Sequence, residues 1–413
     1  MTLLLPLLRY RPVFRTLVLL PLLGSCGLFD PAPRPSVKDR EKVGIVCSLS
    51  GVDAVSEASL KDAALMAIEQ INDDGGLLGK KIEPVWEDGQ SQVSGHVSRT
   101  AELLKAARPT ALFGLWDERS VKGIAPFLRM YPTLAFNMEA PENDYGLKNM
   151  VFLGATTGQQ ALPAVRYLLG RKTGAFNRFY LLGNDEPYAH HMIRAIREQL
   201  LRQKVPPQHI KERYLPAEAA DFSQTVTEIK QFSAGRACVF NMLRGESNLS
   251  FFREFAGQGL SAAYCPVLSF TASEEEFRHL DTEFFAGHLA AKGYFQSSEA
   301  DKNIRFVSDF KLYCAINELP GGIDRVTNDG ICWMYTAIQL WRKAVEKAGT
   351  FDPEKVRGAL AGLELDSPAG AVQMGADGLS LRKKALIGES NPDGQFTVVW
   401  QSDSLLSPAP AGK

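Results

Sequence analysis

The sequence predicts an α/β fold in which parallel sheets are covered by helices on both faces. The first observation is the short run Val43–Cys47, apolar and rich in β-branched residues, which is typical of a strand buried on both faces of a parallel sheet. The second is the segment after it, whose apolar residues recur at helical spacing from Leu60 to Ile71 before Gly75-Gly76 ends the helix. The third is that strand and helix patterns keep alternating along the chain, which indicates a doubly wound architecture.

The first part of the chain predicts four strands with helices between them. A Ser- and Gly-rich loop, Ser48 to Ser56, separates the first strand from its helix. Ser59 followed by Asp62 matches a capping box and predicts the start of that helix near Ser59. The further expected elements are strand 82–86, helix 93–107, strand 111–114, a helix ending at Met130 and strand 133–136. The loops at the carboxyl ends of these strands are where open parallel sheets bind ligands.

A second series of elements is expected from about Gly158 onward. The predicted strands are 178–182, 237–241, 266–270 and 287–294, with helices between them, and two long helices follow at 303–314 and 328–348. Each of these strands again ends in a polar loop, such as Gly183 to Tyr188.

Length and composition describe an ordinary globular protein. With 413 residues, the chain is long enough for two domains. The hydrophobic content of 45%, the charged content of 23% and the net charge of −1 give no electrostatic reason to expect a nucleic-acid partner. No apolar run reaches the roughly 18 residues that a membrane span needs.

The N-terminus has the pattern of an export signal. Arg9, Arg11 and Arg15 form a basic region ahead of an apolar core, and Leu23-Gly24-Ser25-Cys26 matches the lipobox of bacterial lipoproteins. The sequence therefore predicts a signal peptide over 1–25, lipid on Cys26 and a Pro-rich tether over 26–40. A plain secretory signal with an incidental cysteine is the alternative. The last residues, 403–413, are expected to form a disordered tail.

Catalytic and metal-binding signatures were sought without success. The remaining cysteines show no CxxC or Cys/His metal spacing, so no metal and no cofactor are expected. A disulfide between Cys314 and Cys332 is one alternative that the sequence leaves undecided. Cys47 and Cys238 are expected to act as small apolar side chains in buried strands. No GxSxG nucleophile elbow is present, and we predict no catalytic residues and no enzyme activity.

Several segments carry a resemblance to a known family. These are the stretch from Leu49-Ser50-Gly51 through the helix to Asp88, and then FYLLGND, VFNMLRGESN, RVTND and LWRKAVEKAG in the second half of the chain. In this order they resemble the type I periplasmic binding proteins of the Leu/Ile/Val-binding-protein-like family, and within it the urea and short-chain-amide binders. The resemblance implies two lobes joined by a hinge with several chain crossings. It places one lobe at 41–157 plus 296–366 and the other at 158–295 plus 367–402.

The resemblance also implies a ligand site in the loops between the lobes. The positions it carries over are Ser50, Trp116, Glu118, Phe136, Met138, Glu186, Tyr188, Arg244 and Thr271. Three of them depart from the amide binders, because Glu118 replaces a hydroxyl group, Glu186 an aromatic ring and Arg244 a neutral side chain. These charges could pair with one another as a latch across the cleft, pair with a charged ligand, or point into solvent.

The function implied is capture of urea, a short-chain amide or an amino-acid-like solute by a lipid-anchored, extracytoplasmic component of an ABC importer. Its expected partners are the small polar solute, a membrane permease and, through Cys26, the membrane itself. Two alternatives stay open at this point. One is a ligand-sensing module for amides, and the other is an amide hydrolase, which the missing nucleophile disfavours.

Overall fold

The structure is a computed structural model that describes residues 39–140, 145–170, 176–233, 236–278 and 285–408. The predicted signal peptide, Cys26 and nearly all of the tether lie outside the described residues. Within the described part of the chain, no helix combines the length and the apolar character needed to cross a membrane.

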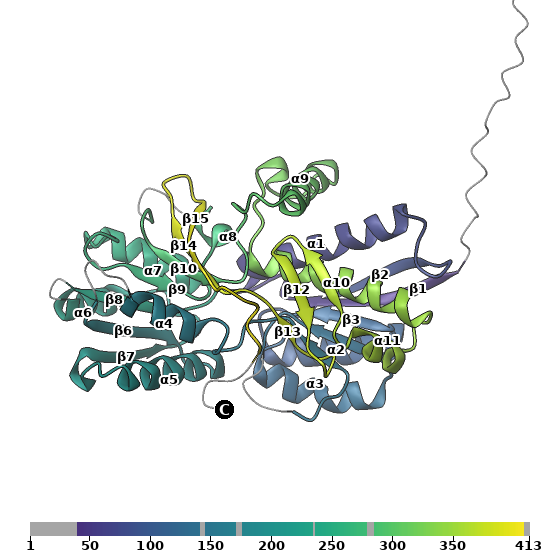
Figure 1. Cartoon of the computed structure of the whole chain (residues 1–413), viewed down its shortest axis with the longest axis horizontal. Helices are drawn as coiled ribbons and strands as arrows, with labels where there is room; N and C mark the ends of the chain where they lie inside the picture. The colour runs from purple at the N-terminus through teal and green to yellow at the C-terminus, as the bar shows by residue number, and fades with distance from the viewer. Residues whose placement is uncertain (1–38, 141–144, 171–175, 234–235, 279–284, 409–413) are drawn as a thin grey trace, which may run out of the picture. The chain divides into compact units, whose positions relative to one another are not determined.

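The first sheet has five parallel strands in the order β2-β1-β3-β4-β5 (Figure 1). Its strands are β1 Arg40–Cys47, β2 Lys81–Asp88, β3 Ala111–Gly114, β4 Leu134–Asn137 and β5 Met150–Phe152. The connecting helices are α1 Ala54–Asp73, α2 Val93–Ala107 and α3 Glu118–Met130. Successive strand residues point to opposite faces, so Ile45 packs with the α1 side and Val46 with the side of α2 and α3. Both faces are therefore buried, as the unbroken apolar run predicts.

The second sheet has seven strands in the order β15-β14-β10-β9-β8-β6-β7. The strands β6 Arg178–Asn184, β7 Ile210–Leu215, β8 Ala237–Met242, β9 Val267–Ser269 and β10 Leu289–Lys292 are parallel, whereas β14 Leu386–Ser390 and β15 Phe396–Gln401 join one edge antiparallel. Its helices are α4 Ala161–Gly170, α5 Pro187–Arg202, α6 Ser223–Ser233, α7 Glu246–Gly257 and α8 Glu274–Phe277. Helices α4 and α5 cover one face and α6, α7 and α8 the other. The predicted doubly wound α/β class is confirmed.

The last third of the chain returns to the first core before it completes the second sheet. Its elements are α9 Asp301–Ile316, α10 Asp329–Ala348, α11 Pro353–Leu360 and a three-stranded sheet of β11 Glu364–Ser367, β12 Gly370–Met374 and β13 Leu381–Arg382. Val372, Met374 and Leu381 of this small sheet belong to the same core as α1 and α10. The chain thus passes between the large sheets after β5, after β10 and after β13. The predicted division into lobes stays a proposal, and this core favours a last crossing at 383–385 rather than at Ser367.

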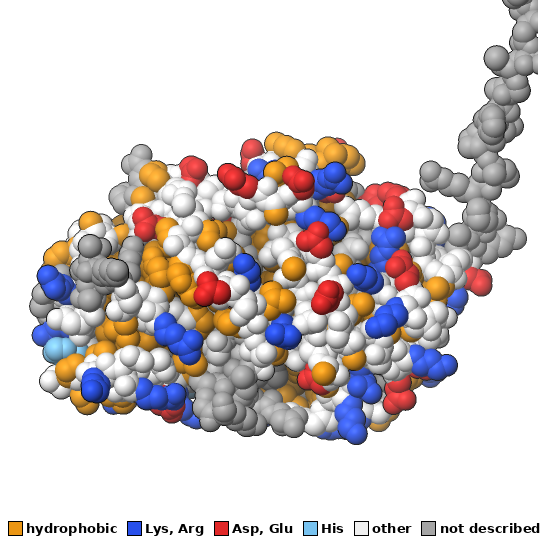
Figure 2. Space-filling model, in the orientation of Figure 1, with side chains coloured by type: hydrophobic (Ala, Val, Ile, Leu, Met, Phe, Trp, Pro, Cys, Tyr) orange, Lys and Arg blue, Asp and Glu red, His pale blue; other side chains and the backbone are white. Residues whose placement is uncertain are grey.

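The surface in view has no strong electrostatic bias. Figure 2 shows Lys and Arg side chains interspersed with Asp and Glu over the face in view.

The five cysteines of the described residues, Cys47, Cys238, Cys265, Cys314 and Cys332, are all free and buried.

The predicted start of the first helix at Ser59 is wrong. Helix α1 begins at Ala54, one turn and a half earlier, and Ser59 and Asp62 serve a buried ion pair instead of a cap. The Arg325 guanidinium, 4% exposed, donates to Ser59 Oγ at 2.6 Å and to Asp62 Oδ2 at 3.2 Å. Burial raises the pKa of Asp62 in spite of the lowering effect of Arg325. A buried carboxyl is tolerated here because a cation that is itself held by Ser59 binds it.

Removing that cation tests how much the pair matters to stability. We expect Arg325→Met to lower the free energy of unfolding by about 3 kcal/mol, because Asp62 would stay buried with only the more distant Lys61 Nζ, at 3.7 Å, as a cationic neighbour. Urea unfolding followed by circular dichroism measures this loss. The control is Arg99→Met, which removes an exposed pair with Glu102 at 2.8 Å that should contribute about 0.5 kcal/mol or less. Equal losses in the two variants would contradict a structural role for the buried pair.

Candidate functional site

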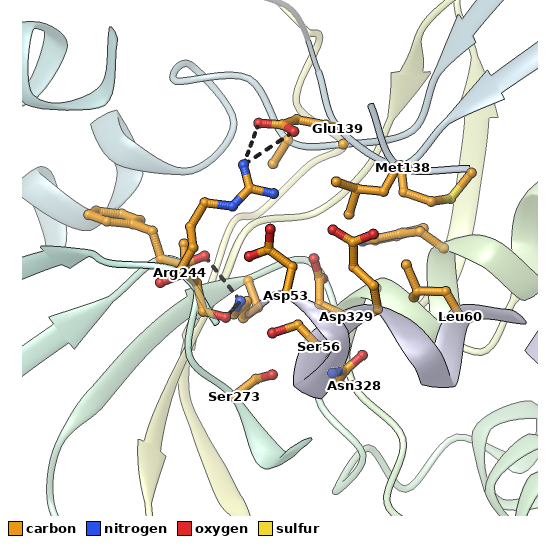
Figure 3. Close-up of a pocket in the computed structure, with 18 of the residues that line it drawn as sticks. Asp53, Ser56, Leu60, Met138, Glu139, Arg244, Ser273, Asn328 and Asp329 are labelled. Carbon is orange, nitrogen blue, oxygen red and sulfur yellow. Dashed lines mark hydrogen bonds and ion pairs between the residues drawn. The ribbon is translucent and has the colours of Figure 1, made fainter. Parts of the chain in front are cut away.

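A cavity of about 170 Å³ lies where loops from the two large sheets meet. Its walls come from the carboxyl ends of β1, β3, β4, β5, β8, β9 and β10 and from the first turns of α1 and α10. This is the edge at which parallel sheets generally bind ligands. The charged side chains that line it are Asp53, Glu57, Glu139, Arg244, Glu276, Lys292 and Asp329, several of which Figure 3 labels. Carboxyl groups therefore outnumber cations in the lining.

Helix α1 supplies two of these carboxyl groups. Asp53 is the N-cap residue, yet its side chain makes no capping hydrogen bond. Glu57, one turn later, is 3% exposed, and its Oε2 accepts a hydrogen bond from the backbone N–H of Ser48 at 2.7 Å. Burial, reinforced by the charge of Asp53, raises the pKa of Glu57 to about 8. The first turns of α1 thus present carboxyl groups that the protein itself compensates poorly.

Arg244 is the guanidinium of the cavity, and it reaches across to the loop after β4. Its Nη1 lies 3.4 and 3.5 Å from the two carboxylate oxygens of Glu139, a contact drawn in Figure 3. Burial raises the pKa of Glu139 to about 7, although Arg244 acts to lower it. Burial lowers the pKa of Arg244, but the carboxylates of Glu139 and Asp53 outweigh it and hold that pKa well above its ordinary value. The pair joins the two sheets.

The loops that carry this pair touch at the backbone. Gly245 has φ +50°, and a Cβ there would lie 2.3 Å from the Val52 carbonyl oxygen in the loop after β1. Only glycine allows this approach without displacing the neighbouring chain. The glycine therefore sets how closely the Arg244 loop can lie against the start of α1.

The remaining charged groups of the cavity have partners. Lys292 Nζ donates to the carbonyl oxygens of Phe270 at 3.0 Å and Thr271 at 2.8 Å. Glu276 accepts hydrogen bonds from the Ser56 hydroxyl at 2.7 Å and from the Ser273 N–H at 2.9 Å. Asp329 Oδ1 accepts from the Gly293 N–H at 2.8 Å.

An apolar surface completes the cavity. It is formed by Leu60, Leu115, Met138, Phe270 and Trp333. The Trp333 ring lies under Lys383, whose Nζ is 4.1 Å from the ring centroid and whose pKa burial lowers to about 8. The cavity can thus hold a solute that has both a polar head and a short apolar part.

A smaller hollow beside the cavity is lined by Trp116, Glu118, Glu186, Tyr188, His191 and Arg244. Two contacts between the sheets lie here: Arg119 donates to Glu186 at 3.1 Å, and His191 lies 3.0 Å from Glu118. Glu118 also accepts from Lys122 at 2.9 Å. We call the three pairs Arg119–Glu186, His191–Glu118 and Arg244–Glu139 the rim pairs.

The structure brings some of the predicted site residues together and separates others. Met138, Tyr188, Arg244 and Thr271 line the main cavity, whereas Trp116, Glu118 and Glu186 line the smaller hollow.

Two predicted residues reach neither space. Ser50 donates its hydroxyl to Asp88 at 2.6 Å. Phe136 is fully buried in the first core, where it stacks on Phe113 with 5.0 Å between ring centroids. Its side chain faces the helices of the core because alternate residues of β4 point to opposite faces of the sheet.

Asp53 and Glu57 line the cavity but are not among the site residues predicted from the sequence, although the sequence contains a signal for them. They precede Leu60 by seven and three residues, so they extend the apolar stripe of α1 toward its N-terminus on the same helical face. Carboxyl groups on a buried face are rare unless they serve binding or catalysis. Across the described residues, no group of three or more His, Cys, Asp or Glu side chains is arranged to hold a metal ion.

Comparison with known proteins places the chain in a family. The model of the periplasmic binding protein domain matches residues 41–412. The chain belongs to this family. As a member of this family, the chain is a binding protein and not an enzyme.

Solved structures of the same fold cover most of the chain. One is a solute-binding protein of an ABC transporter from Rhodopseudomonas palustris in complex with p-hydroxybenzoic acid, 20% identical, with a TM-score of 0.76 over 91% of this chain and 99% of that one. Another is the branched-chain amino acid transporter substrate-binding protein LivJ from Streptococcus pneumoniae in complex with isoleucine, 17% identical, with a TM-score of 0.73 over 90% and 100%.

A local similarity to a curated protein is shorter. A protein named limonene hydroxylase from Geobacillus stearothermophilus is 29% identical over 131 residues, which is 32% of this chain. The match spans 23% of that protein's length.

The buried carboxyl of Glu57 predicts a pH dependence of stability. Its pKa rises from about 4.3 in the unfolded chain to about 8 in the folded protein, so the folded protein binds this proton more tightly. The stability that this proton contributes is complete below the unfolded value and is lost as the pH rises through about 8. Between about pH 5 and pH 8, the free energy of unfolding should therefore fall more steeply for the wild type than for Glu57→Gln. Chemical unfolding of both proteins across this range, with Glu198→Gln on the surface of α5 as control, measures the difference. Parallel curves for wild type and Glu57→Gln would contradict the burial argument.

Proposed function

We propose that this periplasmic binding protein captures a small polar solute, such as urea, a short-chain amide or an amino-acid-like compound, and delivers it to the membrane permease of an ABC importer. The observation that carries the proposal is the cavity itself, because both large sheets contribute polar groups to it at the carboxyl ends of their strands. A solute held there contacts both halves of the molecule, so binding and closure of the halves become linked.

The rim pairs support this function as closing contacts rather than as direct ligands. Glu118 and Glu186 are engaged by His191 and Arg119 from the opposite side, so they support a latch with partners other than one another, unlike the mutual pairing that the sequence left open. The more exposed of these pairs, Arg119 with Glu186, contributes only about 0.2–1 kcal/mol. They bias the closed arrangement weakly, and the solute supplies the rest.

A panel of solutes tests the proposal. Urea, acetamide, acetamidine, guanidine and the common amino acids are added to the full chain, and a solute at 100 times its Kd should raise the free energy of unfolding by about 2.7 kcal/mol, visible as a higher Tm. Small-angle scattering with the binding solute should show a smaller radius of gyration than without it. Absence of any stabilising solute across the panel, together with an unchanged scattering profile, would count against solute capture.

Export and lipid anchoring are proposed from the N-terminal sequence and from the family. Cys26→Ala should move the protein from the detergent-extracted membrane fraction of the producing bacterium to the soluble periplasmic fraction, because stable anchoring needs more than one acyl chain on the cysteine. Fractionation and mass spectrometry of the N-terminal peptide make the measurement. A wild-type protein that carries no lipid and is already soluble would support the plain secretory signal instead.

A further inference from the structure

The main cavity holds more carboxyl groups than cations. Five carboxyl groups and two cationic groups line it. Arg244 is engaged by Glu139, Lys292 by two backbone carbonyl oxygens, and Glu276 by the hydroxyl of Ser56 and the N–H of Ser273. Among the described residues, Asp53, Glu57 and Asp329 form no ion pair: Glu57 is hydrogen-bonded to the N–H and the hydroxyl of Ser48, and Asp329 accepts from the Gly293 N–H.

Glu57 is the most informative of the three. It is 97% buried, lines the cavity and is hydrogen-bonded only to neutral groups, the N–H and the hydroxyl of Ser48, among the described residues. A carboxylate so far from water is costly unless a cation or several N–H donors bind it. Asp53 lies one helical turn earlier on the same face of α1 and interacts electrostatically with Glu57, so a single ligand group can reach both.

We propose that the solute is a small organic cation whose amidinium, guanidinium or ammonium group binds between Asp53 and Glu57. Asp329 lines the same cavity from the first turn of α10, and its Oδ2 can accept a further N–H of this group. The apolar surface formed by Leu60, Met138 and Trp333 then holds a short hydrocarbon part of the solute. This inference rests on the proposed function and specifies the ligand class of that same site.

The charge balance also argues against an anionic solute. A carboxylate ligand would have to share Arg244 with Glu139 and would lie beside the carboxyl groups of Asp53, Glu57 and Asp329. Lys292 cannot offset this charge freely, because its Nζ is held by the backbone of the loop after β9. The raised pKa of Glu57 adds a consequence: a cation that binds the ionised carboxylate should release a proton near neutral pH.

Pairs of solutes with the same shape and different charge test the ligand class. Acetamidine and acetamide form one pair, and guanidine and urea the other. Calorimetry on the full chain should show that the cation of each pair binds at least tenfold more tightly than its neutral counterpart. Titration of acetamidine in two buffers of different ionisation enthalpy should also show that the wild type releases more protons than Glu57→Gln, in which Glu139 still has a pKa raised to about 7.

Substitutions assign the effect to the carboxyl groups. Glu57→Gln, which keeps the shape and one acceptor oxygen, should weaken acetamidine binding by about 10- to 100-fold, the usual value of a lost charge-assisted hydrogen bond. Asp53→Asn should act in the same direction, and its half-exposed position makes it a safe second variant if Glu57→Gln folds poorly. Glu198→Gln on α5 is the matched control and should bind like the wild type.

The outcomes separate this inference from the function on which it rests. Acetamide binding as tightly as acetamidine, or Glu57→Gln and Glu198→Gln binding acetamidine equally well, overturns the cation site. If a neutral or anionic solute of the panel binds while both cations fail, the inference falls and solute capture stands. If no solute binds at all, the proposed function falls with it.

Discussion

The position of the Arg244 guanidinium is the constraint on which the cavity depends. The loop that carries it is fixed by the Asn184 side chain, which accepts a hydrogen bond from the Arg244 N–H at 2.8 Å, and by the backbone contact of Gly245 with the loop after β1. The guanidinium thus belongs to one sheet and lies among the carboxyl groups of the other. Without it, Glu139 would be a buried carboxyl with no nearby cation. Arg244 therefore pairs directly with Glu139 and acts on Asp53 and Glu57 only at longer range.

Such an arrangement is unfavourable for folding alone. Burial raises the pKa of both Glu57 and Glu139, which means that the fold takes up part of the free-energy cost of these side chains in the absence of a ligand. Natural sequences keep such local conflicts mainly at functional sites, where another molecule resolves them. The buried pair of Arg325 with Asp62 forms a contrast, since the cation and a hydroxyl of the chain itself complete it. Glu57 and Asp62 both lie on α1, and they differ in whether the protein supplies a cationic partner within ion-pair distance.

The sequence predicts the frame of the molecule better than its site. Apolar runs and helical spacing locate β3 and α10 almost residue for residue, because burial on both faces of a sheet and along one helix face leaves a strong pattern. The short strands β5, β11, β12 and β13 give no such pattern and were missed. The direction of a loop charge is harder still. Glu118 follows the N-cap Asp117 directly, and a helix that began one residue later would turn its side chain by about 100°. Whether Glu118 lines the main cavity or the smaller hollow therefore depends on the start of α3, and sequence patterns define a helix start only to within a few residues.

Helix α1 would couple binding to closure in the proposed function. Its successive turns present Asp53 and Glu57 to the cavity, Ser56 and Ser59 to α8 of the second sheet, and Leu60 with the residues after it to the first core. Separation of the two sheets would break the hydrogen bonds to Glu275 and Glu276 while it opened the cavity to water. A solute that bridges α1 and the opposite wall binds only the arrangement in which those hydrogen bonds exist. The difference between the solute's affinities for the closed and the open arrangement, rather than any single contact, then determines how far the equilibrium shifts toward closure.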